Sequence, residues 1–214
     1  MAIIGHPVAH SLSPRMQNAA FAARGLDWAY VALDVPPEEL ETAVRGLAAA
    51  GFAGANITAP HKLAVAGIVG SELPSVNTLV GLTGYSTDAA ILDGVPAERP
   101  AIIGDGGAAA AFRHALPQAR TFSRKGVWPP DVRDADLVVH ATSVRDEVLA
   151  EVGEGQTLID LPYPRTATAD AAAAAGACVL DGLDVLLAQG AASFELWTGI
   201  SAPVEVMRAA LRNG

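Results

Sequence analysis

The fold is decided by the stretch Ala101-Ile102-Ile103-Gly104-Asp105-Gly106-Gly107-Ala108-Ala109. Its first three residues are typical of a buried strand, and a helix is predicted from Gly106 to Ala115 directly after it. The glycine-rich turn fits the pattern G-x-G-x-x-[G/A], in which small residues let backbone N–H groups approach a pyrophosphate at a helix N-terminus. An ordinary strand-to-helix turn is the alternative, but the strand–turn–helix order favours a dinucleotide-binding loop.

The end of the next predicted strand, Arg120 to Ser123, indicates which dinucleotide fits. An NAD-binding fold usually ends this strand in an acid that bonds the ribose 2′-OH, whereas NADP needs a cation for its 2′-phosphate. Here the strand ends in Ser123-Arg124-Lys125, with two cations and no acid. We therefore expect NADP, with a solvated basic turn as the alternative. Asp105 would repel a phosphate unless its carboxylate points away, which predicts modest cofactor affinity.

Composition excludes several classes of function. The chain has 214 residues and a formal net charge of −9, which argues against a nucleic-acid or anionic-membrane partner. No apolar run is long enough to span a membrane, and the sequence from Met1 to Pro7 has no basic leader. Cys178, the only cysteine, lies among apolar residues and is predicted to be a small core residue. We expect a soluble cytoplasmic protein that acts on a small molecule and has no metal site.

Strand and helix patterns alternate along the chain, which predicts an α/β fold. In the first half we expect a mainly parallel sheet, with helices opening at Ser13-Pro14 and after Pro36-Pro37 and strands at Trp28 to Leu33, Phe52 to Thr58 and Val76 to Val80. In the second half, strands are expected at Ala101 to Ile103, Arg120 to Ser123, Leu137 to His140, Thr157 to Asp160 and Cys178 to Leu180, followed by helices between Asp184 and Arg212.

A break in this alternation from Asp93 to Arg99 predicts a linker between two α/β domains. We expect a substrate-binding domain at residues 1–94, with C-terminal helices at about 185–214 packing back on it. Residues 95–184 are expected to form a Rossmann-like nucleotide-binding domain.

Lys62 is a candidate acid/base residue. The chain holds two lysines, and its other twelve basic residues are all arginine. Arginine stays protonated in proteins, whereas a partly desolvated lysine can release its proton. Lys62 follows the predicted strand Phe52 to Thr58 and the helix-opening Pro60, a usual position for site residues in α/β folds. A solvated surface lysine is the alternative.

Further polar residues follow other predicted elements. Ser11 and Ser13 stand at the start of a helix, whose unpaired N–H groups could bind a carboxylate without a basic side chain. An ordinary N-cap at Ser13 is the alternative. Asn77 and Asp88 place an amide and a carboxylate at strand ends, where either could also be a turn residue.

Taken together, these segments resemble the shikimate dehydrogenase family, and the resemblance covers nearly the whole chain. The matching segments run in family order: Ser11-Leu12-Ser13-Pro14, Asn56-Ile57-Thr58-Ala59-Pro60-His61-Lys62, Val76-Asn77-Thr78, Tyr85-Ser86-Thr87-Asp88, Gly104-Asp105-Gly106-Gly107-Ala108, Asp160-Leu161-Pro162-Tyr163-Pro164 and Asp181-Gly182-Leu183-Asp184-Val185-Leu186-Leu187-Ala188-Gln189-Gly190-Ala191. The resemblance implies NADP-linked interconversion of 3-dehydroshikimate and shikimate, a step of the chorismate pathway of aromatic amino acid biosynthesis.

The resemblance also implies roles for individual residues. Lys62 and Asp88 would form the catalytic acid–base pair. The substrate would be held by Ser11, Ser13 and Tyr163 at its carboxylate and by Asn56, Thr58, Asn77 and Gln189 at its ring hydroxyls. The cofactor would be held by Gly104, Asp105, Gly106, Gly107, Ala108, Ser123, Arg124, Lys125, Thr142, Leu161 and Gly182. The C-terminal helices must pack on the first domain, because Gln189 has to reach the same cleft as Lys62.

Departures from the family pattern fall mostly on the cofactor half and leave alternatives open. They are Asp105 in the glycine loop, Ser123 where Asn is usual, Arg145 at a glycine-like position, Asp184 and Val185 for Gly and Met, and Ser86 for Asn beside Asp88. A dehydrogenase of quinate or of an amino-substituted shikimate is one alternative, although Ser13 favours shikimate. A non-catalytic ligand-binding protein on the same scaffold is another. We expect a monomer or a homodimer.

Overall fold

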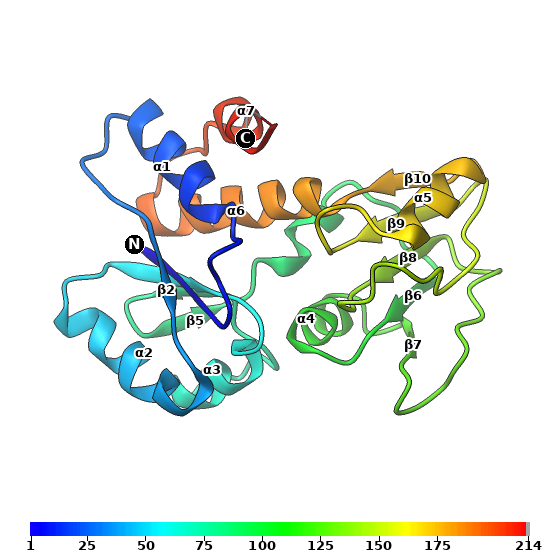
Figure 1. The fold of residues 1–214 in the computed structure, drawn as a ribbon, viewed down its shortest axis with the longest axis horizontal. Coiled ribbons are helices and arrows are strands. Elements are labelled where there is room, and N and C mark those ends of the chain that lie inside the picture. Colours follow the sequence, from blue (N-terminus) through cyan, green and yellow to red (C-terminus); the bar gives the residue numbers. More distant parts are fainter. Residues whose placement is uncertain (213–214) are drawn as a thin grey trace. The chain divides into compact units, whose positions relative to one another are not determined.

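A computed structural model describes residues 1–212, which fold into two compact units (Figure 1). The first unit comprises Met1–Asp88 together with the chain from Leu186 onward, and the second unit comprises Ala89–Val185. The first division lies ahead of the boundary predicted after residue 94, because Ala89, Ile91 and Leu92 pack into the hydrophobic core of the second unit.

The first unit is built on a five-stranded sheet in the order β2-β1-β3-β4-β5. Its strands are β1 (Ala2–Gly5), β2 (Val31–Asp34), β3 (Gly54–Ile57), β4 (Thr78–Val80) and β5 (Thr83–Tyr85). β1 pairs in parallel with β2 and β3, whereas β4 pairs antiparallel with β3 and β5. β4 alone runs against the other four strands, so the sheet is mainly parallel, as the sequence predicted. The tight turn at Gly81, which has a φ of +56°, folds β5 directly back on β4.

β2 begins at Val31 and not at the predicted Trp28, because the side chain of Asn18 forms hydrogen bonds with the backbone N–H and C=O groups of Tyr30. The N–H of Tyr30 donates to Asn18 Oδ1 at 2.8 Å, and Asn18 Nδ2 donates to the carbonyl oxygen of Tyr30 at 2.9 Å. A backbone N–H or C=O group satisfied in this way is not available for a strand ladder. Pairing with β1 therefore starts only after Tyr30.

Helices cover both faces of this sheet (Figure 1). On one face lie the short η1 (Pro37–Glu39), α2 (Leu40–Ala49) and α3 (Lys62–Ile68). On the other lie α1 (Ser13–Ala23), α7 (Val204–Arg212) and the part of α6 (Gly182–Thr198) from Leu186 onward. Side chains alternate between faces along a strand, so Ile57 joins the core under α2 and α3 while Asn56 points toward α6. In the α6 layer the rings of Phe21 and Phe194 stack at 5.7 Å.

The second unit is built on an all-parallel five-stranded sheet in the order β10-β9-β8-β6-β7. Its strands are β6 (Pro100–Ile103), β7 (Arg120–Phe122), β8 (Leu137–His140), β9 (Thr157–Asp160) and β10 (Cys178–Leu180). The chain runs outward from β6 to β7 and then crosses to β8 on the other side of β6. Such a reversal is the topological switch point at which open α/β sheets bind ligands, beyond the carboxyl ends of the strands.

The faces of the second sheet are covered unequally. α4 (Gly107–Ala115) and the short η2 (Asp88–Leu92) cover the face that carries Ile102 and Val139. α5 (Ala167–Ala174) covers part of the opposite face. Every residue of the crossover 123–136 between β7 and β8 is described and none is helical, and Val132 and Ala135 fill that part of the core instead.

Cys178 corrects one sequence-based prediction. The residue was expected in the core, but it is exposed and unpaired. β10 forms the edge of the second sheet, so Cys178 has a partner strand on one side only. An apolar run at a sheet edge reads in sequence like a buried strand.

Among residues 1–212, no helix is both long enough and apolar enough to cross a lipid bilayer.

Candidate active site

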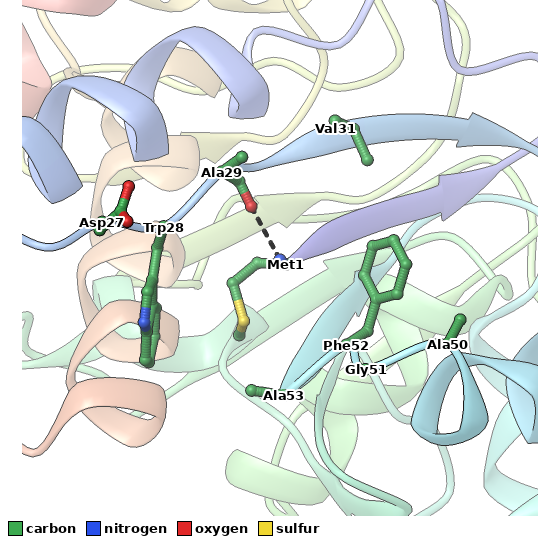
Figure 2. Close-up of a pocket in the computed structure, with 9 residues that line it drawn as sticks. All are labelled: Met1, Asp27, Trp28, Ala29, Val31, Ala50, Gly51, Phe52 and Ala53. Carbon is green, nitrogen blue, oxygen red and sulfur yellow. Dashed lines mark hydrogen bonds between the residues drawn. The ribbon is translucent and has the colours of Figure 1, made fainter.

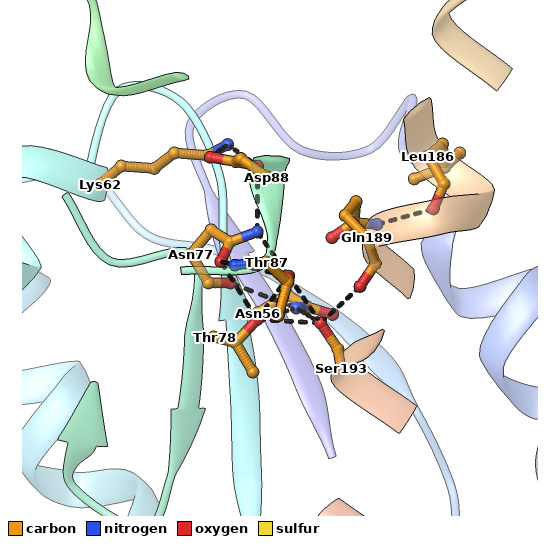
Figure 3. Close-up of polar contacts among 9 residues, drawn as sticks. All are labelled: Asn56, Lys62, Asn77, Thr78, Thr87, Asp88, Leu186, Gln189 and Ser193. Carbon is orange, nitrogen blue, oxygen red and sulfur yellow. Dashed lines mark hydrogen bonds and ion pairs between the residues drawn. The ribbon is translucent and has the colours of Figure 1, made fainter. Parts of the chain in front are cut away.

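A lysine–aspartate pair lies beyond the ends of strands β3 and β5 in the first sheet (Figure 3). Lys62 follows β3 and Asp88 follows β5, and these two strands end at the same edge because β4 runs antiparallel to both. Lys62 Nζ lies 2.7 Å from Asp88 Oδ1 and 2.6 Å from Oδ2. The two side chains are only 15% and 8% exposed. Lys62 is therefore a largely buried, paired lysine and not a solvated surface one.

Asn77 holds the carboxylate of this pair. Its Nδ2 donates to Asp88 Oδ1 at 2.9 Å, and its Oδ1 accepts the backbone N–H of Thr87 at 2.7 Å. Asn77 is 2% exposed and Asp88 is 6% exposed, so neither is an exposed turn residue. Asp88 is fixed by an ammonium on one side and an amide on the other, which sets the position of Lys62 Nζ.

Three buried hydroxyl groups, which the sequence analysis missed, connect the pair to α6. We call Thr78, Thr87 and Ser193 the hydroxyl cluster. Ser193 Oγ lies 2.9 Å from Thr78 Oγ1 and 3.1 Å from Thr87 Oγ1, and the two threonine oxygens are 3.2 Å apart. Ser193 lies four residues after Gln189 and therefore on the same face of α6, which is the one sequence signal that could have indicated it.

Asn56 supports the hydroxyl cluster from β3. Its Nδ2 donates to Ser193 Oγ at 2.9 Å and to Thr78 Oγ1 at 3.0 Å, and its Oδ1 accepts from the Tyr30 hydroxyl at 2.7 Å. Asn56 is 3% exposed. Its amide oxygen and nitrogen are thus both bonded to protein groups, so the geometry favours a positioning role. The contact with a ring hydroxyl that the family resemblance implies stays a prediction.

Gln189 is connected to the lysine–aspartate pair by hydrogen bonds (Figure 3). Ser193 Oγ donates to the carbonyl oxygen of Gln189 at 2.8 Å, and the chain of contacts continues through Thr87 and Asn77 to Asp88. The side-chain Nε2 of Gln189 donates to the carbonyl oxygen of Leu186 at 2.9 Å. The expected proximity of this part of α6 to the Lys62 edge of the sheet is therefore observed within the first unit.

The two serines open α1 as the sequence predicted. Ser11 Oγ accepts the backbone N–H of Ser13 at 3.3 Å, and Ser13 is 2% exposed. Leu12 stands at the N-cap position, so Ser13 is not the ordinary N-cap that the alternative required. Thr58 lies just beyond β3, where its N–H donates to the carbonyl oxygen of Ile4 at 2.8 Å.

In the second unit, the glycine loop lies at the topological switch point. Gly104 follows β6 with a φ of +137°, and a Cβ at this position would lie 2.5 Å from the carbonyl oxygen of Ala141, which follows β8. Only glycine fits there. Gly106 is the N-cap of α4 and no side chain caps this helix, so the N–H groups of the first turn, including those of Gly107 and Ala108, can bind an anion.

The predicted 2′-phosphate residues are both paired with carboxylates. Lys125 Nζ lies 2.9 Å from Asp105 Oδ2, and Arg124 Nη2 donates to Glu147 Oε2 at 2.6 Å. The guanidinium carbon of Arg124 also lies 5.3 Å from the centre of the Trp128 ring, a cation–π contact. Sequence analysis missed both partners of Arg124, which are Glu147 from another segment and Trp128 four residues further along the chain.

Thr142, another predicted cofactor residue, ends a buried polar chain. Asp160 Oδ1 lies 2.7 Å from His140 Nδ1, and His140 Nε2 lies 2.7 Å from Thr142 Oγ1. Asp160 also accepts the hydroxyl and the backbone N–H of Thr166, which caps α5. Within residues 1–212, no group of three or more His, Cys, Asp or Glu side chains is arranged to hold a metal ion.

The remaining predicted residues also belong to the second unit. Ser123 accepts the N–H of Gly126 in a tight turn after β7. Leu161 donates its N–H to the carbonyl oxygen of His140 at 3.1 Å. A Cβ on Gly182 would lie 2.8 Å from the carbonyl oxygen of Leu161, so glycine permits a close approach of two backbone segments. The role implied for Tyr163 at the substrate carboxylate stays a prediction.

A separate pocket of about 340 Å³ lies by the amino ends of strands β1, β2 and β3 in the first sheet (Figure 2). Its wall includes Trp28, Phe52 and Ala53, which precede or begin strands, whereas Lys62 follows the carboxyl end of β3. The pocket therefore shares no residue with the lysine–aspartate pair or the hydroxyl cluster.

The fold, the glycine loop and the buried lysine–aspartate pair define the class of α/β dehydrogenases. Comparison with known proteins is more specific. The family model of the shikimate dehydrogenase substrate-binding domain matches residues 3–77. The family model of the shikimate 5′-dehydrogenase C-terminal domain matches residues 182–212. Full-length relatives agree, and the chain belongs to the shikimate dehydrogenase family.

Two relatives and one solved structure illustrate the similarity. The chain is 40% identical to the NADP(+) shikimate dehydrogenase of Moorella thermoacetica, over 100% of this chain and 92% of the relative. It is 39% identical to that of Methanopyrus kandleri, over 98% and 93%. It matches the structure of Thermus thermophilus shikimate 5-dehydrogenase in complex with NADP(H) and shikimate with a TM-score of 0.86 and 31% identity, over 99% of this chain and 97% of the other.

Proposed function

We propose that the protein is an NADP-dependent shikimate dehydrogenase, which interconverts 3-dehydroshikimate and shikimate. The observation that carries the proposal is the largely buried pair of Lys62 and Asp88, held in place by Asn77. Family membership and the named activity of the relatives support it. The glycine loop fits the cofactor, because Gly104 tolerates no side chain and α4 is uncapped.

When bound, NADPH supplies a hydride to the carbonyl carbon of the substrate. Negative charge then develops on the carbonyl oxygen, which must receive a proton. We assign that proton to Lys62 Nζ, which Asp88 holds with contacts of 2.7 and 2.6 Å. In the direction of oxidation, the neutral Lys62 amine accepts the hydroxyl proton, and the adjacent carboxylate stabilises the ammonium that forms.

We assign the substrate carboxylate to Ser11 and Ser13 of the first unit, because hydroxyl and backbone N–H groups bind a carboxylate without a basic side chain. The role that the family resemblance implies for Tyr163 of the second unit stays a prediction. The ring hydroxyls are assigned to Asn56, Thr58, Asn77 and Gln189. Asn56 and Asn77 also position the hydroxyl cluster and Asp88. The first unit is then the substrate-binding domain, and it contains both members of the acid–base pair.

The second unit is then the nucleotide-binding domain. Backbone N–H groups of Gly106, Gly107 and Ala108 face the diphosphate, and Arg124 and Lys125 face the 2′-phosphate. We assign supporting contacts to the cofactor to Ser123, Thr142, Leu161 and Gly182. Parallel strands, a glycine at the switch point and cations after the second strand support this assignment.

We place the reaction in the cytoplasm, in the chorismate pathway that leads to aromatic amino acids. NADPH and small polar substrates are available in that compartment.

Lys62, Asp88 and the hydroxyl cluster all come from one chain. We therefore expect a monomer or a homodimer in which each copy carries its own acid–base pair.

The test follows the absorbance of the reduced nicotinamide with shikimate and with quinate, each with NADP and with NAD. Turnover of shikimate with NADP, and much slower turnover of the other pairs, is expected. Preference for quinate would assign the protein to the alternative substrate. Shikimate binding measured by calorimetry, without turnover on either cofactor, would identify a ligand-binding protein.

A further inference from the structure

Four charged side chains of the second unit form two ion pairs, and one of these pairs includes Asp105 of the glycine loop. Two are the cations that the proposed function assigns to the 2′-phosphate, Arg124 and Lys125. Each is already paired with a carboxylate, Glu147 at 2.6 Å and Asp105 at 2.9 Å. The cluster therefore carries no net charge, although its two basic residues alone would attract a phosphate.

Asp105 stays ionised in this arrangement. A hydrogen bond from Lys125 and the charge of its ammonium lower the pKa of the Asp105 carboxyl below its ordinary value, and the guanidinium of Arg113 adds to the effect. The carboxylate thus keeps its negative charge in the glycine loop between Gly104 and Gly106. It points toward the Lys125 side chain, which is 85% exposed.

We propose that Asp105 and Glu147 are specificity-determining residues that compete with the cofactor's 2′-phosphate for Lys125 and Arg124. This inference rests on the proposed function and goes beyond it, because it assigns the strength of the NADP preference to two acidic residues. The 2′-phosphate competes with each carboxylate for its cation, and the nearby negative charge of each carboxylate opposes binding of the phosphate. NAD carries an uncharged hydroxyl at the 2′ position of its adenosine ribose, so it does not compete with either carboxylate.

The exposure of the four side chains makes the exchange possible. Ion pairs between exposed groups are weak, so a phosphate dianion can replace a carboxylate at the same cation. Trp128 holds Arg124 through its ring face, which leaves the guanidinium edge free to change partners. The two carboxylates thus lower affinity for NADPH without closing the site.

The experiment measures dissociation constants of NADPH and NADH by isothermal titration calorimetry on the full chain. Asp105→Asn and Glu147→Gln remove one carboxylate each and keep the side-chain shape. Asp131→Asn is the matched control, because Asp131 forms an exposed pair with Arg133 in the same unit and its substitution changes net charge equally.

Glu147→Gln is expected to tighten NADPH by roughly threefold to tenfold and to leave NADH within about twofold. Asp105→Asn is expected to tighten NADPH by a similar factor and NADH by less, since it also removes a charge beside the diphosphate. Asp131→Asn should change neither. Unchanged or weaker NADPH binding in both Asp105→Asn and Glu147→Gln, or an equal gain in Asp131→Asn, would overturn the proposal. Failure of the unsubstituted chain to turn over shikimate tests the proposed function separately, because these constants are measured without substrate.

Discussion

At the scale of single residues, Lys62 carries the sharpest prediction. Lys62→Arg keeps the positive charge, but a guanidinium, unlike a lysine ammonium, does not give up its proton in proteins. We expect kcat to fall on the order of 10²-fold or more, with KM within a few-fold. Steady-state kinetics with shikimate and NADP measure both parameters. Lys125→Arg, at the only other lysine, controls for the exchange of an ammonium for a guanidinium outside the acid–base pair. Because Lys125 is assigned to the 2′-phosphate, any effect should fall on KM for NADP, and kcat should be retained.

The partner of Lys62 gives a second readout. Asp88→Asn removes the charge that holds Nζ, and in combination with Lys62→Arg the losses should be less than additive, because the two residues act as a unit. A rise in KM with unchanged kcat in Lys62→Arg would assign Lys62 to binding alone.

Arg124 sets the second residue-scale prediction. Arg124→Ala should weaken NADPH by about 1.5 kcal/mol, the lower end for a charged hydrogen bond, because Glu147 already competes for the guanidinium. NADH binding should hardly change. Titration of both cofactors checks this, with Arg133→Ala as a control for lost surface charge. Equal losses for both cofactors would move the role to Lys125 or to folding of the loop.

A residue type that is rare in this chain and follows a predicted strand could be predicted as a site residue from the sequence. Common hydroxyl residues inside strands and helices could not. Lys62 was identified because lysine is rare in this chain and follows a predicted strand. Thr78 and Ser193 carry hydroxyls that are common in strands and helices, and only tertiary packing brings them together. Asp105 was identified as a difficulty for phosphate binding, but its partner Lys125 could not be predicted because the contact depends on side-chain conformation.

At the scale of elements, α6 is joined to the first sheet through Ser193. Ser193→Ala removes contacts with Asn56, Thr78 and Thr87, and leaves buried polar groups with fewer partners. We expect a loss of about 1–2 kcal/mol in the free energy of unfolding. We also expect a lower kcat, because Thr87 and Asn77 link the cluster to Asp88. Urea unfolding and kinetics measure the two effects.

Thr198→Ala is the control for this substitution. Both hydroxyls donate to the carbonyl oxygen four residues earlier in α6, but the other contacts of Thr198 are confined to Ile200 next to the helix end. The control should therefore lose little stability. Equal losses in the two variants would show that the contacts across to the sheet contribute nothing.

Elements with strong local signals were predicted well. The strands at Leu137–His140, Thr157–Asp160 and Cys178–Leu180 match their predicted bounds, because each contains adjacent apolar residues that favour a strand. The first two are central strands of their sheet, whereas the third is its edge strand. β5 was missed because Thr83–Tyr85 is short and two of its three residues are exposed. The late start of β2 depends on the Asn18 side chain, a contact between segments that periodicity does not reveal.

At the scale of the whole molecule, the division into two units predicts where each ligand protects the backbone. Shikimate should slow amide hydrogen exchange at residues 54–62, 77–88 and 186–193, which contain the acid–base pair and Gln189. NADPH should slow exchange at residues 104–109 and 123–128 in the second unit. Exchange measured by mass spectrometry with each ligand alone checks this. Protection by shikimate confined to the second unit would contradict the assignment of the substrate to the first.

The interrupted course of the first unit has a consequence for biosynthesis. The second unit is one continuous segment, whereas the first unit is completed by α7 and by α6 from Leu186 onward, which follow the second unit in the sequence. Domains fold as units while the chain is being synthesised. The second unit is therefore expected to finish folding first, although the ribosome makes most of the first unit before it. Until α6 has been synthesised, Asn56 lacks its hydrogen-bond partner Ser193, and the ring of Phe21 lacks its stacking partner Phe194. The nascent chain therefore exposes one face of its first sheet.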